Sequence, residues 1–133
     1  MNTACLREVP LFARLGKQDI EALGRIADEL DVREGKVVAR QGDLGHEFFV
    51  LEAGSASVEI DGEHIAELSP GSFFGEIALI EEDRRTATVT ATGDSTVIVM
   101  TGSDFRNLKR TMPQVYETVR AEIAKRRGLA QTA

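Results

Sequence analysis

Apolar residues recur with two different periods along the chain, and the changes of period divide it into three parts. In the first part, apolar side chains recur every three or four positions, at Ile20, Leu23, Ala27 and Leu30. This spacing predicts an amphipathic helix that packs on a core. Gly16 is an acceptable N-cap for this helix, and we expect it to end near Asp28.

The middle part consists of short β-type segments separated by turns. We expect strands at Val37–Ala39, Phe48–Leu51, Ser57–Ile60, Glu63–Leu68, Thr86–Ala91 and Thr96–Thr101. The dipeptide Asp61-Gly62 is a strong hairpin signal, and it would place Glu59 opposite His64 and Val58 opposite Ile65. Many short strands broken by glycine turns predict an antiparallel barrel or a jelly roll.

The last part is helical again. Ser103-Asp104 is expected to cap a helix, and Pro113 predicts a break before a second one. The second helix carries an apolar stripe that we expect to pack in the core, formed by Met112, Val115, Tyr116, Val119 and Ile123.

Length and composition indicate one globular domain. The chain has 133 residues, which we divide into a helical part over about 9–30, strands over about 31–101 and C-terminal helices over about 102–127. The net charge of −6 argues against binding to a nucleic acid backbone. No apolar run is long enough for a membrane span. The single cysteine, Cys5, is expected to be an ordinary thiol in a reducing compartment, so we expect a cytoplasmic protein.

The candidate chemistry lies between Phe73 and Val89. Gly75 lets the backbone approach a ligand closely, because glycine has no Cβ atom. If a helical turn begins at Glu76, its free N–H groups favour an anion. The Glu76 carboxylate accepts hydrogen bonds from hydroxyls, and the planar five-donor fork of Arg85 suits a phosphate. A ligand with both a phosphate and a sugar hydroxyl would satisfy this set.

Catalytic and metal chemistry are not indicated. The two histidines, His46 and His64, form no ligand pair of the kind that metal sites use, and we expect both to be surface or loop residues. No serine or cysteine has a histidine in a nucleophile motif. We therefore expect no metal, no cofactor and no enzymatic activity, and a cupin-like metal enzyme is disfavoured.

Two motifs carry a resemblance to a known family. Residues 74–80 read FGEIALI and residues 85–89 read RTATV, while an earlier glycine motif, QGDLG at 41–45, leads through Phe49 to Gly54. Together they resemble the cyclic nucleotide-binding domain family, over about Val9 to Arg126. That family includes the catabolite activator proteins, the regulatory subunits of cyclic-AMP-dependent kinase and the cyclic-nucleotide-gated channels.

The resemblance implies both a fold and a site. The implied fold is α+β, an eight-stranded antiparallel jelly-roll β-barrel flanked by N-terminal and C-terminal helices. In the implied site, Glu76 accepts a hydrogen bond from the ribose 2′-hydroxyl and Arg85 pairs with the cyclic phosphate, assisted by backbone N–H groups. The ligand-binding residues carried over from the motif are Phe74, Gly75, Glu76, Ile77, Ala78, Arg85, Thr86 and Ala87.

One departure from the family pattern lies next to this arginine. The family usually has proline there, and this chain has Arg84, which should loosen the turn before Arg85 somewhat. Thr86 is compatible with cyclic GMP and also occurs in domains that prefer cyclic AMP. We expect cyclic AMP as the ligand, with cyclic GMP also admitted.

Two functions follow from the resemblance. The first is a cyclic-nucleotide sensor, in which ligand binding favours closure of the C-terminal helix over the barrel. The second is a ligandless docking or dimerisation module that keeps the motif. The expected partners are a cyclic nucleotide and a protein effector or fused output domain, with a homodimer left open. We expect no membrane insertion by this chain and no nucleic acid binding, since it ends before a helix-turn-helix could fit.

Overall fold

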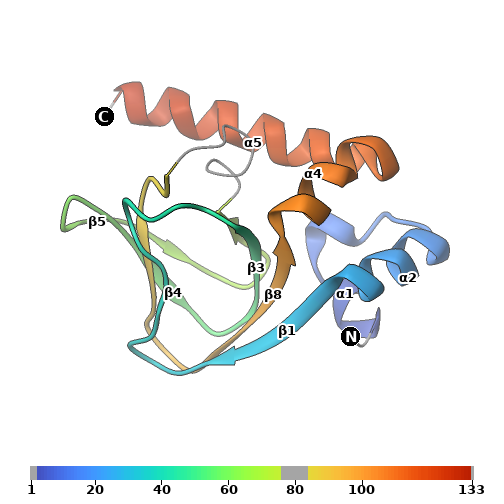
Figure 1. Ribbon diagram of the computed structural model, residues 1–133. Helices are drawn as coiled ribbons and strands as arrows, with labels where there is room; N and C mark the ends of the chain where they lie inside the picture. Colours follow the sequence, from blue (N-terminus) through green and yellow to red (C-terminus); the bar gives the residue numbers. More distant parts are fainter. Residues whose placement is uncertain (1–2, 76–83, 133) are drawn as a thin grey trace.

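The computed structural model describes residues 3–75 and 84–132 of the chain, with the side chains of residues 122, 123 and 126–132 left out. The N-terminal elements are α1 (Thr3–Arg7), the short 3-10 helix η1 (Pro10–Phe12) and α2 (Lys17–Ile26). The strands are β1 (Ala27–Val32), β2 (Val37–Ala39), β3 (Glu47–Ala53), β4 (Ala56–Ile60), β5 (Glu63–Leu68), β6 (Phe73–Phe74), β7 (Thr88–Ala91) and β8 (Ser95–Thr101). The C-terminal helices are α4 (Gly102–Thr111) and α5 (Pro113–Thr132), and α5 runs from α4 across the top of the strands in Figure 1.

The strands form two four-stranded antiparallel sheets, in the orders β1-β8-β3-β6 and β2-β7-β4-β5. The predicted mixture of helices with eight antiparallel strands is therefore correct. The predicted closed barrel is wrong for the described residues, because no ladder among them joins the edge strands of one sheet to those of the other. The edge strand β6 has only two residues, and both pair with β3.

Strand β3 separates two hydrophobic clusters. Its residues Phe48 and Val50 face a cluster shared with the helices, whereas Phe49 and Leu51 face a cluster between the two sheets. Successive side chains of a strand point to opposite faces, so a strand covered on both faces reads as a continuous apolar run. This explains the uninterrupted apolar sequence from Phe48 to Leu51, since all four residues are buried.

Three differences from the prediction concern the helices. Helix α2 ends at Ile26 rather than near Asp28, because Ala27 begins a strand that pairs with β8. The segment α1 was not predicted, although its Leu6 is fully buried. The side chain that caps α4 belongs to Thr101 rather than to Ser103, since its hydroxyl accepts the backbone N–H of Asp104 at 3.2 Å.

The hairpin at Asp61-Gly62 is confirmed. Both residues have positive φ angles, 54° and 81°, as a type I′ turn requires. Glu59 lies opposite His64 as predicted, but Val58 pairs with Ala66 instead of Ile65. The register shifts between Val58 and Glu59, so Ile65 is an additional residue in β5.

The C-terminal helices follow the prediction more closely. α4 ends at Thr111 and α5 begins at Pro113, which lacks the N–H that a continuous helix would need.

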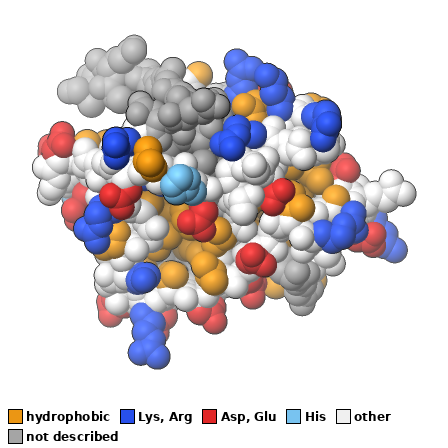
Figure 2. All heavy atoms as spheres, in the orientation of Figure 1, with side chains coloured by type: hydrophobic (Ala, Val, Ile, Leu, Met, Phe, Trp, Pro, Cys, Tyr) orange, Lys and Arg blue, Asp and Glu red, His pale blue; other side chains and the backbone are white. Residues whose placement is uncertain are grey.

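None of the described helices is long and apolar enough to cross a membrane. On the face shown in Figure 2, acidic and basic side chains of the described residues are interspersed.

Candidate functional site

Arg85 is the buried cation of the predicted site. Only 8% of the residue is exposed. Its Nη1 donates to the carbonyl oxygen of Gly75 at 3.0 Å, and its Nη2 donates to the carbonyl oxygen of Glu47 at 2.9 Å. The guanidinium carbon lies 5.5 Å from the centre of the Phe49 ring, within cation–π range. These contacts fix the plane and the position of the guanidinium group.

The two sequence motifs meet at this arginine. The backbone N–H of Arg85 donates to the carbonyl of Asp43 at 2.7 Å, and the N–H of Gly42 donates to the carbonyl of Arg85 at 3.0 Å. A β-bridge joins Leu44 to Arg84 beside them. The segment 41–45 and the segment that carries Arg85 are therefore one hydrogen-bonded unit, although about 40 residues separate them in the sequence.

Arg84 has a structural contact of its own. Its Nη1 donates to the carbonyl oxygen of Gly42 at 2.8 Å. A proline at this position would offer no such donor. The replacement that was expected to loosen the turn therefore adds a hydrogen bond between the two motifs.

Gly75 adopts a backbone conformation that favours glycine. Its φ angle is +89°. A Cβ atom at this position would lie 2.4 Å from Nη1 of Arg85 and 2.8 Å from the carbonyl oxygen of Glu47. The close approach predicted from the sequence is thus an approach to Arg85 and to the strand that carries Glu47.

The remaining predicted ligand residues lie in different surroundings. Phe74 is buried between the sheets and stacks on Phe49, with 4.9 Å between ring centres. Thr86 is exposed and Ala87 is half-buried. Glu76, Ile77 and Ala78 lie outside the described residues, so their predicted roles stay predictions.

A hydrogen-bond network beside the site was missed in the sequence. The backbone N–H of Gln41 donates to Oγ1 of Thr88 at 3.0 Å. The Gln41 amide also bonds to Asp61, by Nε2 to Oδ1 at 3.0 Å and from the Asp61 N–H to Oε1 at 2.8 Å. Gln41 therefore links the first motif to β7 and to the β4–β5 turn. Its place beside a glycine motif was the only sequence signal for this role.

The histidines lie where loop and surface residues were expected. His64 Nε2 is 2.8 Å from Oε1 of Glu67 on the exposed face of β5. His46 is exposed, and its carbonyl oxygen accepts the N–H of Gly102 at the start of α4.

The apolar stripe of α5 packs in the core as predicted. Val115, Tyr116 and Val119 are buried in the cluster that the helices share with β3 and β8. Tyr116 also contacts Phe105 of α4, with ring centres 5.7 Å apart. The side chain of Ile123, the last residue of the predicted stripe, lies outside the described set.

Comparison with known proteins identifies the family. The family model described as "Cyclic nucleotide-binding domain" matches residues 29–112, which is more than half of the chain. The matched region contains both motifs and all eight predicted ligand residues. The chain belongs to the cyclic nucleotide-binding domain family.

Individual relatives agree with this assignment. The chain is 35% identical over 127 residues to a cyclic nucleotide-gated potassium channel of Rhizobium etli, covering 96% of this chain and 36% of the channel. It is 40% identical over 98 residues to the cAMP-dependent protein kinase regulatory subunit of Blastocladiella emersonii, covering 70% of this chain and 24% of that subunit. The chain therefore spans only about a third or less of these relatives.

A solved structure confirms the fold. The structure named "cAMP bound PfPKA-R (141-441)" superposes with a TM-score of 0.88, covering 99% of this chain and 46% of that one. The two sequences are 20% identical, so this likeness concerns the fold alone.

Proposed function

We propose that this domain binds a cyclic nucleotide, cyclic AMP in preference to cyclic GMP, and acts as the regulatory part of a larger protein. The observation that carries the proposal is Arg85, a buried cation that backbone carbonyls and an aromatic ring hold in one position at the junction of both motifs. A preorganised guanidinium loses little conformational freedom when it meets a phosphate.

The ligand chemistry follows from this cation and from the motif. Arg85 pairs with the cyclic phosphate as a charge-assisted donor. Glu76 accepts the ribose 2′-hydroxyl, a role that rests on its position in the motif. Thr86 is exposed beside Arg85, where a ligand can reach its hydroxyl. The preference for cyclic AMP is supported by the names of the kinase relatives, which contain cAMP.

The output is a movement of the C-terminal helix. α5 begins after the break at Pro113 and packs on α4 and η1. A helix joined by a break can change its angle without losing its own hydrogen bonds. Nucleotide binding favours the arrangement in which α5 closes over the sheets, and so shifts the population toward it.

The domain is regulatory rather than catalytic. The family assignment supports this, and the sequence offers no nucleophile or general base in a recognised motif. We place it in a reducing compartment such as the cytoplasm, in agreement with its single cysteine.

Isothermal titration with cyclic AMP and with cyclic GMP tests the binding. Arg85→Ala should weaken cyclic AMP binding by about tenfold or more, because hydrogen bonds to charged groups contribute roughly 1.5–3 kcal/mol. Arg33→Ala, a change of an exposed arginine, is the matched control and should bind normally. Absence of heat with either nucleotide at high concentration would overturn the proposal.

Distance measurement tests the movement of α5. In a Cys5→Ser background, Lys125→Cys on α5 and Glu63→Cys on β5 provide two exposed positions for spin labels. Cyclic AMP should shorten the distance distribution between the labels. An unchanged distribution in a sample that binds nucleotide would exclude closure while leaving the binding proposal intact.

A ligandless docking module is the second candidate, and the same arginine favours it. The contacts of Arg85 with Gly75, Glu47 and Phe49 give it a structural role even without a ligand. Such a module would show no nucleotide heat, and Arg85→Ala would leave the affinity for its protein partner unchanged as long as the variant folds. A sensor would lose its nucleotide response.

A further inference from the structure

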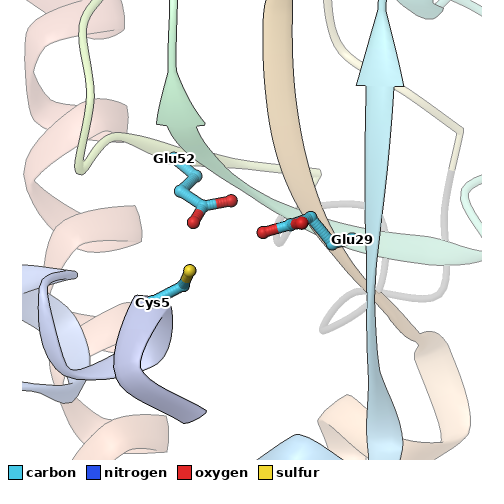
Figure 3. A group of neighbouring side chains, drawn as sticks. All are labelled: Cys5, Glu29 and Glu52. Atoms are coloured by element: carbon cyan, nitrogen blue, oxygen red, sulfur yellow. The ribbon is translucent and has the colours of Figure 1, made fainter. Parts of the chain in front are cut away.

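Three side chains of metal-binding type converge outside the proposed nucleotide site. They are Cys5 on α1, Glu29 on β1 and Glu52 on β3, and Figure 3 shows them pointing toward a common point. The thiol sulfur and one carboxylate oxygen of each glutamate all lie within 4.8 Å of one another. The three residues are far apart in the sequence, so no spacing motif could reveal them.

Sheet geometry brings the two carboxylates together. Strands β1 and β3 both pair with β8, and Glu29 lies opposite Ile98. The pairing of β3 shifts between Leu51 and Ala53, which makes Glu52 the additional residue of a β-bulge. Glu52 follows Phe48 and Val50 at intervals of two residues, so it lies on the same helix-covered face of the sheet. Glu52 faces Glu29 across β8, with α1 on the same side (Figure 3).

Glu52 is half-buried, and one of its two carboxylate oxygens lacks a hydrogen-bond partner among the described residues. Its Oε2 atom is inaccessible to solvent, and no described group lies in hydrogen-bonding geometry to it. A buried carboxylate oxygen without a partner is unfavourable, and a second carboxylate beside it adds repulsion. A cation between the two carboxylates would remove both penalties.

The raised pKa values of Cys5 and Glu29 agree with a strongly negative environment. Glu52, as a hydrogen-bond acceptor and then as a nearby charge, raises the pKa of the Cys5 thiol to about 11. It also raises the pKa of Glu29 above its usual value. Glu8 adds to the effect on Cys5, and Asp31 adds to the effect on Glu29. A bound divalent cation would instead lower the pKa of the Cys5 thiol and displace its proton to solvent.

We propose that Cys5, Glu29 and Glu52 bind one Zn²⁺ ion. A set of one sulfur and two oxygen ligands suits Zn²⁺, whereas Mg²⁺ and Ca²⁺ take oxygen ligands. Ligand atoms of a tetrahedral zinc site lie roughly 3.3–3.8 Å apart, so the present arrangement closes on an ion by a small side-chain rotation. Three protein ligands leave the fourth position for water.

The ion would connect the N-terminal helix to the first sheet. α1 packs on α2 and η1, and η1 in turn contacts α5. Zn²⁺ would therefore fix the position of the N-terminal elements against β1 and β3. This proposal departs from the expectation, drawn from the two histidines, that the domain holds no metal.

Cobalt substitution tests the proposal on the full chain after treatment with a chelator. Co²⁺ should bind in a 1:1 ratio with a thiolate-to-cobalt charge-transfer band, and Zn²⁺ should displace it. Cys5→Ser should abolish the band, and Glu29→Gln or Glu52→Gln should each weaken binding by about tenfold or more. Asp28→Asn, whose side chain points to the opposite face of β1, is the matched control and should bind normally.

Two results would overturn the proposal. One is absence of the charge-transfer band in the unsubstituted protein. The other is unchanged Co²⁺ affinity in both glutamate variants, which would mean that the Cys5 thiol binds the ion alone. Circular dichroism and urea unfolding of each variant establish that any loss of binding occurs in folded protein.

Discussion

Substitution of Gly75 by alanine tests the central contact of the site. The φ angle of Gly75 is +89°, and an added Cβ atom would meet both Nη1 of Arg85 and the carbonyl oxygen of Glu47. The guanidinium group could retreat, but the Glu47 oxygen belongs to the backbone of β3. Alanine should therefore displace Arg85 from its place above Phe49, and this displacement should weaken nucleotide binding.

The structure separates two contributions to the expected loss. An L-residue in the left-handed region costs roughly 1–2 kcal/mol. Displacement of the Arg85–Gly75 hydrogen bond removes about 1.5–3 kcal/mol more, because the donor is charged. Gly35→Ala isolates the first contribution, since Gly35 has a φ angle of +88° and nothing within 4 Å of an added Cβ atom.

Urea unfolding and calorimetry measure the two variants side by side. Gly75→Ala should lose about 1.5–3 kcal/mol more of its free energy of unfolding than Gly35→Ala. Its affinity for cyclic AMP should fall by about tenfold or more, which corresponds to 1.4 kcal/mol, whereas Gly35→Ala should bind normally. Equal stability and equal affinity of the two variants would mean that Gly75 is not needed to place Arg85.

Three further substitutions separate ligand contacts from packing. Phe49→Leu removes the ring beside Arg85. The affinity for cyclic AMP in calorimetry should fall roughly fivefold, as a loss of about 1 kcal/mol implies. An unchanged Kd would mean that the ring does not help to position Arg85. Thr101→Ala removes the acceptor for the Asp104 N–H and should lower the free energy of unfolding in urea by about 1 kcal/mol. Thr101→Ser is its control, and equal losses in both would exclude the cap. Phe105→Ala empties a fully buried position and should lower the free energy of unfolding by about 3–5 kcal/mol, so a loss under about 1 kcal/mol would show that the core refills the space.

Local signals predicted the elements whose backbone they determine directly. Asp61-Gly62 gave the correct hairpin because both residues tolerate positive φ angles. Pro113 marked the correct break because it lacks an N–H group. The end of α2 could not be predicted in this way. Ala27 fits the helical spacing, but it pairs with Met100, and this contact spans more than 70 residues of sequence.

The candidate nucleotide site shows the same division between local signals and contacts of residues far apart in the sequence. Gly75 and Arg85 were found because glycine admits a close approach and the planar fork of arginine suits a phosphate. The role of Gln41 depends on contacts with Asp61 and Thr88, which are 20 and 47 residues away. Phe49 looked like an ordinary core residue, since nothing in the strand pattern indicates which side chain will lie above its ring.

The contacts of Arg85 serve a sensor and a ligandless module alike. A guanidinium group has five N–H donors, and the carbonyls of Gly75 and Glu47 accept from two different nitrogens of this one. Arg85 therefore connects the two motifs. In the proposed function the same guanidinium also pairs with the phosphate, so one residue supports both the fold and the ligand. Substitution of Arg85 therefore changes both the stability of the fold and the affinity for the ligand. Comparison of Gly75→Ala with Gly35→Ala instead measures the effect of the position of the guanidinium group.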